Sequence, residues 1–294
     1  MTDSSTIEIG LSLKKKLGST RALLNSFWTA LVSLCMIITL IPLIAVLIFV
    51  TVQGLGQVNL DLFTKLPPPP GLSQGGIANA ILGTLLTVGL ATLISVPIGV
   101  LTAVYLSEFS AGNQIARWVR FATNVLSGVP SIIAGIFAYG LLVATKIVGF
   151  SAVAGGVALA VLMLPTIIRT TDEALQFVPQ EIRWAAFGLG AYNYQTVLKV
   201  VLPAATPAIL TGVTLAIARA AGETAPLIFT ALFSNFWPKG IFEPIATLSV
   251  LVYNYAIVPF KPQQELAWAG SLILVLLVLS TSVAARWATR QKTY

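Results

Sequence analysis

The sequence contains no histidine and only one cysteine, Cys35. Catalysis or metal ligation by histidine is therefore excluded, as are an internal disulfide and a cluster of thiolate ligands. The chain also lacks the sequence of a nucleotide-binding P-loop, G-x-x-x-x-G-K followed by Ser or Thr, and the G-x-S-x-G sequence around a nucleophilic serine. We therefore expect this chain to be no enzyme and to hold no cofactor and no metal.

Charge is scarce as well. Charged residues make up 9% of the 294 residues, whereas hydrophobic residues make up 56% and the mean hydropathy is +0.90. A soluble domain has roughly 25% charged residues, so this chain cannot cover itself with a solvated surface. The composition predicts an integral membrane protein.

Five windows of the sequence contain no Asp, Glu, Lys or Arg: 22–60, 66–107, 121–145, 147–168 and 266–285. A bilayer core of ~30 Å needs ~20 residues of helix, so each window can hold one span. A sixth span is expected over about 204–231, and it alone contains charge, at Arg219 and Glu223. The predicted fold is an all-α integral membrane protein with six transmembrane helices.

Basic residues are unevenly distributed between the connecting segments. If the N-terminus is cytoplasmic, six spans return the C-terminus to the same side. Twelve basic residues then face the cytoplasm: Lys14, Lys15, Lys16, Arg21, Arg117, Arg120, Arg169, Arg183, Lys199, Arg286, Arg290 and Lys292. Four face outward: Lys65, Lys146, Lys239 and Lys261. Cytoplasmic loops carry the excess of Lys and Arg, so both termini are expected in the cytoplasm, and the net charge of +7 needs no nucleic acid as a partner.

The chain divides into four parts. Residues 1–27 and 287–294 are expected to be cytoplasmic tails, 28–75 hold the first span and an outer loop, and 76–286 hold the main transmembrane domain. The first apolar segment is too long for the apolar region of a signal peptide, so we interpret it as a retained span. The outer loop contains four consecutive prolines within 66–71, where a stiff linker is favoured over a docking motif.

Residues 127–131, with the sequence Ser-Gly-Val-Pro-Ser, predict a break or kink in the third span. Two interpretations are equally supported there. The small residues either allow close packing of helices or expose backbone and hydroxyl groups to a polar path.

Residues 172–203 are too polar to cross lipid and too apolar for an ordinary loop. Pro179 suits the first position of a helix that ends near Gly188, with Gly190 in the turn. Asn193 suits the cap of a second helix. The pattern predicts a helix–turn–helix with an apolar face, which either meets a partner or rests on lipid.

The same segment carries a recognisable spacing. Ala185, Ala186, Gly190, Leu202 and Pro203 fall where bacterial ABC-importer permeases have the pattern E-A-A, three residues, G, nine residues, I-x-L-P. Two positions differ, with Trp184 in place of Glu and Val200 in place of Ile. The segment therefore resembles the cytoplasmic coupling loop of type I ABC importers. The resemblance implies that these seven residues contact an ATP-binding subunit.

Two further stretches narrow the resemblance. Residues 217–228, Ile-Ala-Arg-Ala-Ala-Gly-Glu-Thr-Ala-Pro-Leu-Ile, resemble the fifth span of phosphate-importer permeases of the A type, and residues 129–137 resemble their third span. The resemblance covers about 76–286. It implies a bacterial inner-membrane importer with a second, C-type permease, two subunits that bind ATP and Mg²⁺, and an extracytoplasmic phosphate-binding protein.

Arg219, Glu223 and Thr224 are the candidate substrate path. A charge inside a span costs at least ~2.5 kcal/mol, and a guanidinium matches phosphate oxygens. Glu223 would neutralise Arg219 in the absence of an anion, and Thr224 would add a hydroxyl donor. The alternative is a structural ion pair between residues four apart on one helix, whose breakage when buried would cost roughly 3–5 kcal/mol.

Two other functions stay open. The same architecture would serve a permease for sulfate or molybdate. An ion-coupled secondary transporter would need intramembrane carboxylates, of which Glu223 is the only one expected, and the spans show no obvious inverted repeat.

Overall fold

The computed structural model describes residues 20–110 and 112–289, and all regular structure within them is helical. The chain forms two compact units, Met1–Phe49 and Val50–Tyr294. Helix α1 (Thr20–Leu55) begins in the first unit and ends in the second. The basic residues Lys14, Lys15, Lys16, Arg290 and Lys292 lie outside the described residues.

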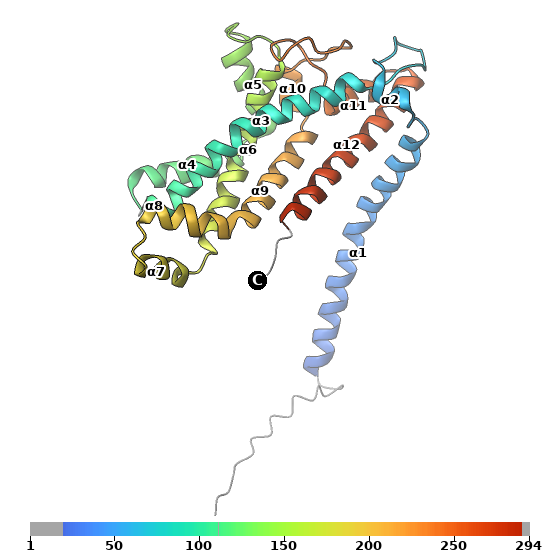
Figure 1. The fold of residues 1–294 in the computed structure, drawn as a ribbon. Helices are drawn as coiled ribbons and strands as arrows, with labels where there is room; N and C mark the ends of the chain where they lie inside the picture. The colour runs from blue at the N-terminus through green and yellow to red at the C-terminus, as the bar shows by residue number, and fades with distance from the viewer. Residues whose placement is uncertain (1–19, 111, 290–294) are drawn as a thin grey trace, which may run out of the picture. The chain divides into compact units, whose positions relative to one another are not determined.

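Four long helices form the body of the second unit. They are α3 (Ala78–Val104), α6 (Ala152–Gln176), α9 (Leu202–Gly222) and α12 (Lys261–Thr289). Helix α6 packs between α3 and α9, and α9 also packs against α12 (Figure 1). Small residues allow these close approaches. A Cβ atom on Gly156 of α6 would lie 2.9 Å from the Leu90 Cβ of α3.

The structure agrees with the prediction of six spans if one bent pair of helices is counted as a single span. Within the described residues, five helices are long and apolar enough to cross a membrane: Leu23–Leu55, Ala78–Phe109, Ala152–Gln176, Asn193–Gly222 and Lys261–Ala284. The remaining expected span is a pair of helices, Gln114–Ser127 and Ser131–Val143, bent by 108°. The count reaches six if this pair is one span.

The break in the third span falls where the sequence predicts it. Helix α4 (Gln114–Ser127) ends at the glycine of the Ser-Gly-Val-Pro-Ser stretch, and α5 (Ser131–Ala138) begins directly after the proline. Pro130 lacks an N–H group and precedes α5 with φ −57° and ψ 138°. Because these dihedral angles are not helical, the chain turns sharply between the two helices.

The fifth span differs from the prediction at both ends. It is expected over 204–231, whereas its helix begins at Asn193 and ends at Gly222. Helix α8 (Asn193–Thr196) and the π-helical turn η3 (Val197–Val201) continue directly into α9. The π turn accommodates Pro203, which has no N–H for the helical ladder.

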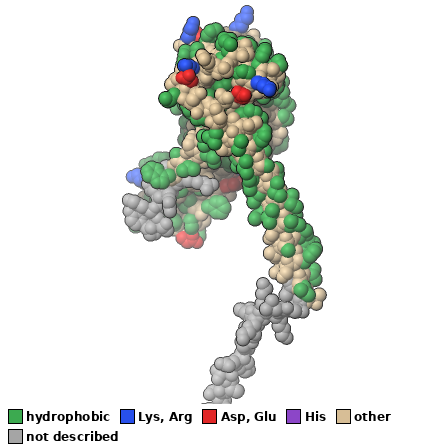
Figure 2. Space-filling model, turned by 90° about the vertical axis from the view of Figure 1, so that its right-hand side faces the viewer, with side chains coloured by type: hydrophobic (Ala, Val, Ile, Leu, Met, Phe, Trp, Pro, Cys, Tyr) green, Lys and Arg blue, Asp and Glu red, His purple; other side chains and the backbone are tan. Residues whose placement is uncertain are grey.

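The two ends of the second unit carry different short elements. Helices α2 (Leu60–Thr64), α10 (Ala225–Thr230) and α11 (Leu248–Ala256) lie at one end, and α7 (Gln180–Gly188) and α8 lie at the other (Figure 1). We name these the α2 end and the α7 end. In Figure 2, charged side chains gather over the α2 end, above a flank covered mainly by hydrophobic ones. This separation fits helices that cross a bilayer.

The proline-rich loop at the α2 end is held by its own chain. The side chain of Gln263, which is 3% exposed, donates to the Pro69 carbonyl at 3.0 Å and accepts from the Gly71 N–H at 3.3 Å. Gly71 has φ +85°. These bonds give the loop a fixed conformation on α12.

Candidate translocation and docking sites

Helix α9 stops one turn after Arg219. It ends at Gly222, and Glu223 has φ −71° and ψ 130°, which takes the chain out of the helix before α10 begins. The Glu223 N–H donates to the Ala220 carbonyl at 3.2 Å, and its carbonyl accepts from the Ser249 hydroxyl at 2.8 Å. Bonds to both α9 and α11 therefore fix this break.

Arg219 and Glu223 form a loose ion pair. Their Nε and Oε1 atoms are 3.6 Å apart, and the side chains are 63% and 18% exposed. Among the described residues, the guanidinium has no other hydrogen-bond or ion-pair partner. The expected pairing is present, but the two charges do not lie on one continuous helix, because Glu223 follows the end of α9. Such a pair contributes only ~0–1 kcal/mol.

Thr224 follows Glu223 in the break and is half-buried. Its carbonyl accepts from the N–H groups of Leu227 and Ile228, at 3.1 and 3.2 Å. Within the described residues its hydroxyl makes no hydrogen bond. The structure thus brings the three predicted path residues together at one break, with the Thr224 hydroxyl available as a donor.

A crevice runs between α6 and α9 beside this break. It is lined by Leu162, Met163, Thr166, Ala216, Arg219, Ala220 and Glu223. Its volume of about 10 Å³ admits about one water molecule, not a phosphate ion. An anion bound by Arg219 would therefore lie on the exposed side of the guanidinium, away from α6.

The two broken spans meet each other. A Cβ atom on Gly135 of α5 would lie 2.5 Å from the Cα atom of Pro226 in α10, so only glycine fits there. These residues come from the two stretches that resemble phosphate-importer permeases. Non-helical backbone within membrane spans is tolerated where it is buried in protein or lines a cavity, so the contact between these two broken spans marks a candidate path.

The predicted helix–turn–helix is present at the α7 end. Helix α7 follows Pro179, which takes the N-cap position rather than the expected first helical position, and contains Glu181 in its first turn. Gly190 lies in the turn after α7 with φ +85°, and its N–H donates to the Phe187 carbonyl at 2.9 Å. The expected cap of the second helix is wrong by one residue: Tyr192 precedes the helix, and its N–H donates to the side chain of Gln195 at 3.0 Å.

The α7 segment exposes an apolar surface. Large side chains that are at least 43% exposed are Phe177, Ile182, Trp184, Phe187, Leu189, Tyr192, Tyr194 and Leu198. The rings of Tyr192 and Tyr194 stack with centroids 6.1 Å apart. Ala185 is exposed as well. We name these nine residues the docking surface.

Two small residues of the loop have a role within the chain itself. Ala186 is only 9% exposed and faces its own chain. A Cβ atom on Gly190 would meet nothing within 4 Å, so glycine is needed there for its positive φ. Val200, at the end of η3, and Leu202 are half-buried, whereas Pro203 is exposed; Leu202 and Pro203 are the first two residues of α9.

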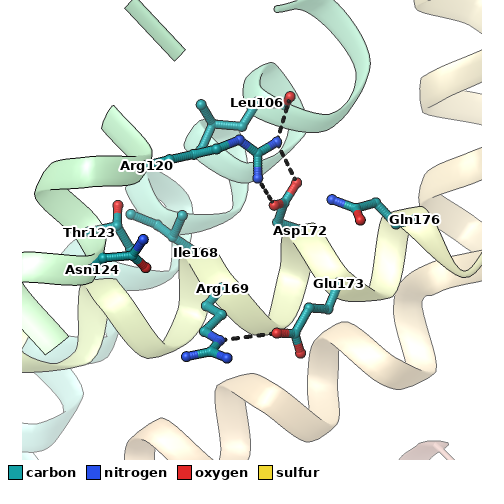
Figure 3. Close-up of a pocket in the computed structure, with 9 residues that line it drawn as sticks. All are labelled: Leu106, Arg120, Thr123, Asn124, Ile168, Arg169, Asp172, Glu173 and Gln176. Carbon is teal, nitrogen blue, oxygen red and sulfur yellow. Dashed lines mark hydrogen bonds and ion pairs between the residues drawn. The ribbon is translucent and has the colours of Figure 1, made fainter. Parts of the chain in front are cut away.

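A polar pocket of about 340 Å³ lies between α4, α6 and the π-helical end of α3, η1 (Tyr105–Phe109). Its lining residues are Leu106, Arg120, Thr123, Asn124, Ile168, Arg169, Asp172, Glu173 and Gln176 (Figure 3). Arg120 forms an ion pair with Asp172 and donates to the Leu106 carbonyl at 3.1 Å. Arg169 and Glu173 form an exposed pair at 3.0 Å. Both arginines are thus already partnered.

Comparison with known proteins shows the family to which the chain belongs. Residues 95–293 match the family model described as "Binding-protein-dependent transport system inner membrane component". The chain is 42% identical over 251 residues to the phosphate transport system permease protein PstA of Yersinia pestis, covering 85% of each chain. It belongs to the PstA family of inner-membrane transport permeases.

Other members of the PstA family are similar over nearly the whole chain. The Haemophilus influenzae PstA is 42% identical over 262 residues, covering 89% of this chain and 92% of the relative. A Mycobacterium tuberculosis protein named PstA 1 is 35% identical over 269 residues. The family consists of permease components, which agrees with the prediction that the chain is no enzyme.

Solved structures share the fold. An inward-facing methionine ABC transporter, MetNI, superimposes with a TM-score of 0.56 at 22% identity, covering 73% of this chain and 93% of the solved one. A bacterial ABC transporter involved in the import of alginate superimposes with a TM-score of 0.61 at 15% identity, covering 92% and 97%. This confirms the predicted ABC-importer permease fold.

Sequence reasoning missed the charged residues at the α7 end. Glu108, Arg120, Asp172 and Arg183 pair across four helical elements, although they are far apart in the sequence. One signal was available, since Asp and Glu together number only 10 in the whole chain. Carboxylates at the ends of apolar spans are candidates for pairing with the nearby arginines.

Proposed function

We propose that this chain is one of two permease subunits of an ATP-driven importer of inorganic phosphate. The PstA relatives are named for phosphate transport. In this proposal the chain forms half of the translocation path. ATP and Mg²⁺ are bound by two partner subunits, and an extracytoplasmic binding protein delivers the substrate.

The observation that carries the proposal is the position of Arg219 directly before the break in α9. Its side chain is 63% exposed, and among the described residues its guanidinium is held only by the 3.6 Å pair with Glu223. A planar guanidinium can donate two parallel hydrogen bonds to phosphate oxygens. Glu223 balances the charge between transport events, and the Thr224 hydroxyl adds a third donor.

The exposed side of Arg219 must be covered by another protein surface if phosphate binds there. The crevice on its α6 side holds about one water molecule, so phosphate binds on the opposite, exposed side. We infer that a second permease, of the C type, covers this side and adds further donors. One guanidinium and one hydroxyl would otherwise replace too few of the hydrogen bonds that the anion loses when it leaves water.

The proposed orientation places the α7 end in the cytoplasm together with both termini. The supporting observation is the excess of basic residues on that side in the sequence. The docking surface then faces the ATP-binding subunits. Its exposed aromatic residues, Trp184 and Phe187 on α7, fit a helix that lies in an apolar groove.

A different tetrahedral oxyanion is the second candidate substrate, because the same guanidinium would also bind sulfate or molybdate. An ion-coupled transporter is less well supported. In the described part of the chain, the only carboxylate at the break is Glu223, and it is paired with Arg219.

The test is ATP hydrolysis by the assembled complex in proteoliposomes. The complex contains this chain, the second permease, both ATP-binding subunits and the binding protein. We expect phosphate to stimulate hydrolysis and ATP to drive uptake of radiolabelled phosphate, with sulfate and molybdate inactive. Stimulation by sulfate or molybdate instead would refute the substrate, and uptake by the purified chain alone without ATP would refute the class of transporter.

A further inference from the structure

The α7 end contains two arginines that bind in the same way. Arg183 of α7 forms an ion pair with Glu108 of η1 and donates through Nη2 to the Leu175 carbonyl of α6 at 2.8 Å. Arg120 of α4 forms an ion pair with Asp172 of α6 and donates to a carbonyl of η1. Each arginine therefore joins the end of α3 to the end of α6, once from α7 and once from α4.

The contact made by α7 is the more deeply buried of the two. The side chains of Arg183 and Glu108 are 10% and 7% exposed, whereas Arg120 is 42% exposed. Glu108 also accepts from the Ser107 hydroxyl at 3.2 Å. A buried charge is tolerated only with such partners, so this pair has a fixed geometry.

Helix α7 also packs against α8 and η3, but few of its own side chains are buried. Of its nine residues, only Arg183 and Ala186 are buried, while the side chains around them form the docking surface. A force applied to that surface by a partner reaches α9 through α8 and η3, and it reaches α3 and α6 through Arg183. The ion pair with Glu108 transmits a movement of Arg183 to the end of α3, and the hydrogen bond to the Leu175 carbonyl transmits it to α6.

These helices lead to the candidate path. Helix α6 forms one wall of the crevice beside Arg219. Helix α4, joined to α6 through Arg120 and Asp172, ends at the break before α5. A shift of α7 that moves α3 and α6 together would therefore also move both broken spans. Coupling of this kind travels through packed helices that have two alternative arrangements.

We infer that Arg183 and Glu108 are positioning residues that couple the ATP-binding subunit to the translocation path. This inference rests on the proposed docking of α7. The fork geometry of Arg183 is essential, because one guanidinium must bind a carboxylate on one helix and a carbonyl on another. Lysine carries its three donors on one nitrogen, so it cannot reproduce the two separate nitrogens, Nη1 and Nη2, that bind Glu108 and the Leu175 carbonyl.

The test compares three forms of the complete transporter in proteoliposomes. Arg183→Lys keeps the charge and loses the fork. The double variant Glu108→Leu with Arg183→Met removes the pair and keeps its volume, so no unpaired charge is left buried. The control is Arg169→Gln with Glu173→Gln, an exposed pair at the same end.

We expect both test variants to assemble and to hydrolyse ATP, but to move about tenfold less phosphate per ATP, within the ~5–150-fold range of allosteric couplings. The control should keep the wild-type ratio. A wild-type ratio in the double variant would overturn the inference. Parallel losses of complex yield, hydrolysis and uptake would also overturn it, because the pair would then only hold the fold.

A separate cross-linking experiment tests whether α7 contacts the ATP-binding subunit. Ala185→Cys, on the docking surface, is cross-linked to the ATP-binding subunit in a Cys35→Ser background. The absence of a cross-link in the otherwise wild-type complex would refute the proposed docking of α7. A cross-link in every variant, with coupling unchanged, would refute only the role of Arg183 and Glu108.

Discussion

Replacement of Arg219 separates a substrate contact from a structural ion pair. Arg219→Lys keeps the positive charge and loses the planar fork, whereas Arg219→Gln removes the charge. The double variant Arg219→Gln with Glu223→Gln removes both members of the pair. Each variant is measured for yield of the solubilised complex and for uptake of radiolabelled phosphate.

The magnitudes follow from the geometry of the pair. At 3.6 Å, with side chains 63% and 18% exposed, its loss should cost no more than ~1 kcal/mol of stability. All three variants should therefore assemble. Hydrogen bonds to charged groups contribute ~1.5–3 kcal/mol each, so losing one in Arg219→Lys should slow uptake about tenfold. Losing two in Arg219→Gln should slow it about 100-fold, at ~1.4 kcal/mol per factor of ten.

The double variant decides between the two roles. If Arg219 contacts phosphate, uptake stays low when Glu223 is also neutral, because the donors are still absent. If the pair is only structural, removing both charges restores uptake. Arg169→Gln is the matched control, since Arg169 and Glu173 have the same spacing of four residues, and it should keep uptake within about twofold of wild type. Recovery of uptake in the double variant would remove Arg219 from the path.

Three more predictions address orientation, docking and the stability of the turn after α7. In a Cys35→Ser background, a cysteine at Lys65 should react with an impermeant reagent outside intact cells, and a cysteine at Lys199 should not; labelling of position 199 would contradict the proposed topology. Trp184→Ala should leave the chain in the membrane and weaken retention of the ATP-binding subunit on purification, because it removes an exposed aromatic anchor. Gly190→Ala should lower stability by about 1 kcal/mol through its φ of +85°, and an unchanged thermal midpoint would show that the turn tolerates a side chain.

Much of the fold follows from local patterns. The charge-free windows locate the membrane helices because lipid tolerates neither charge nor unpaired backbone groups. The proline and glycine of the Ser-Gly-Val-Pro-Ser stretch predict the break between α4 and α5. Pro179 and Gly190 bracket α7 to within one residue, since a fixed φ and a positive φ are properties of single residues.

The sequence by itself determined the class of protein, the number of apolar segments, the helix–turn–helix and the candidate residues Arg219, Glu223 and Thr224. Only the tertiary structure decided that α9 ends before Glu223 and that α5 meets α10. It also joined Arg183 to Glu108, which lie 75 positions apart in the sequence. Helix periodicity and hydropathy report the environment of neighbouring residues, whereas a pairing between distant helices depends on which faces pack together.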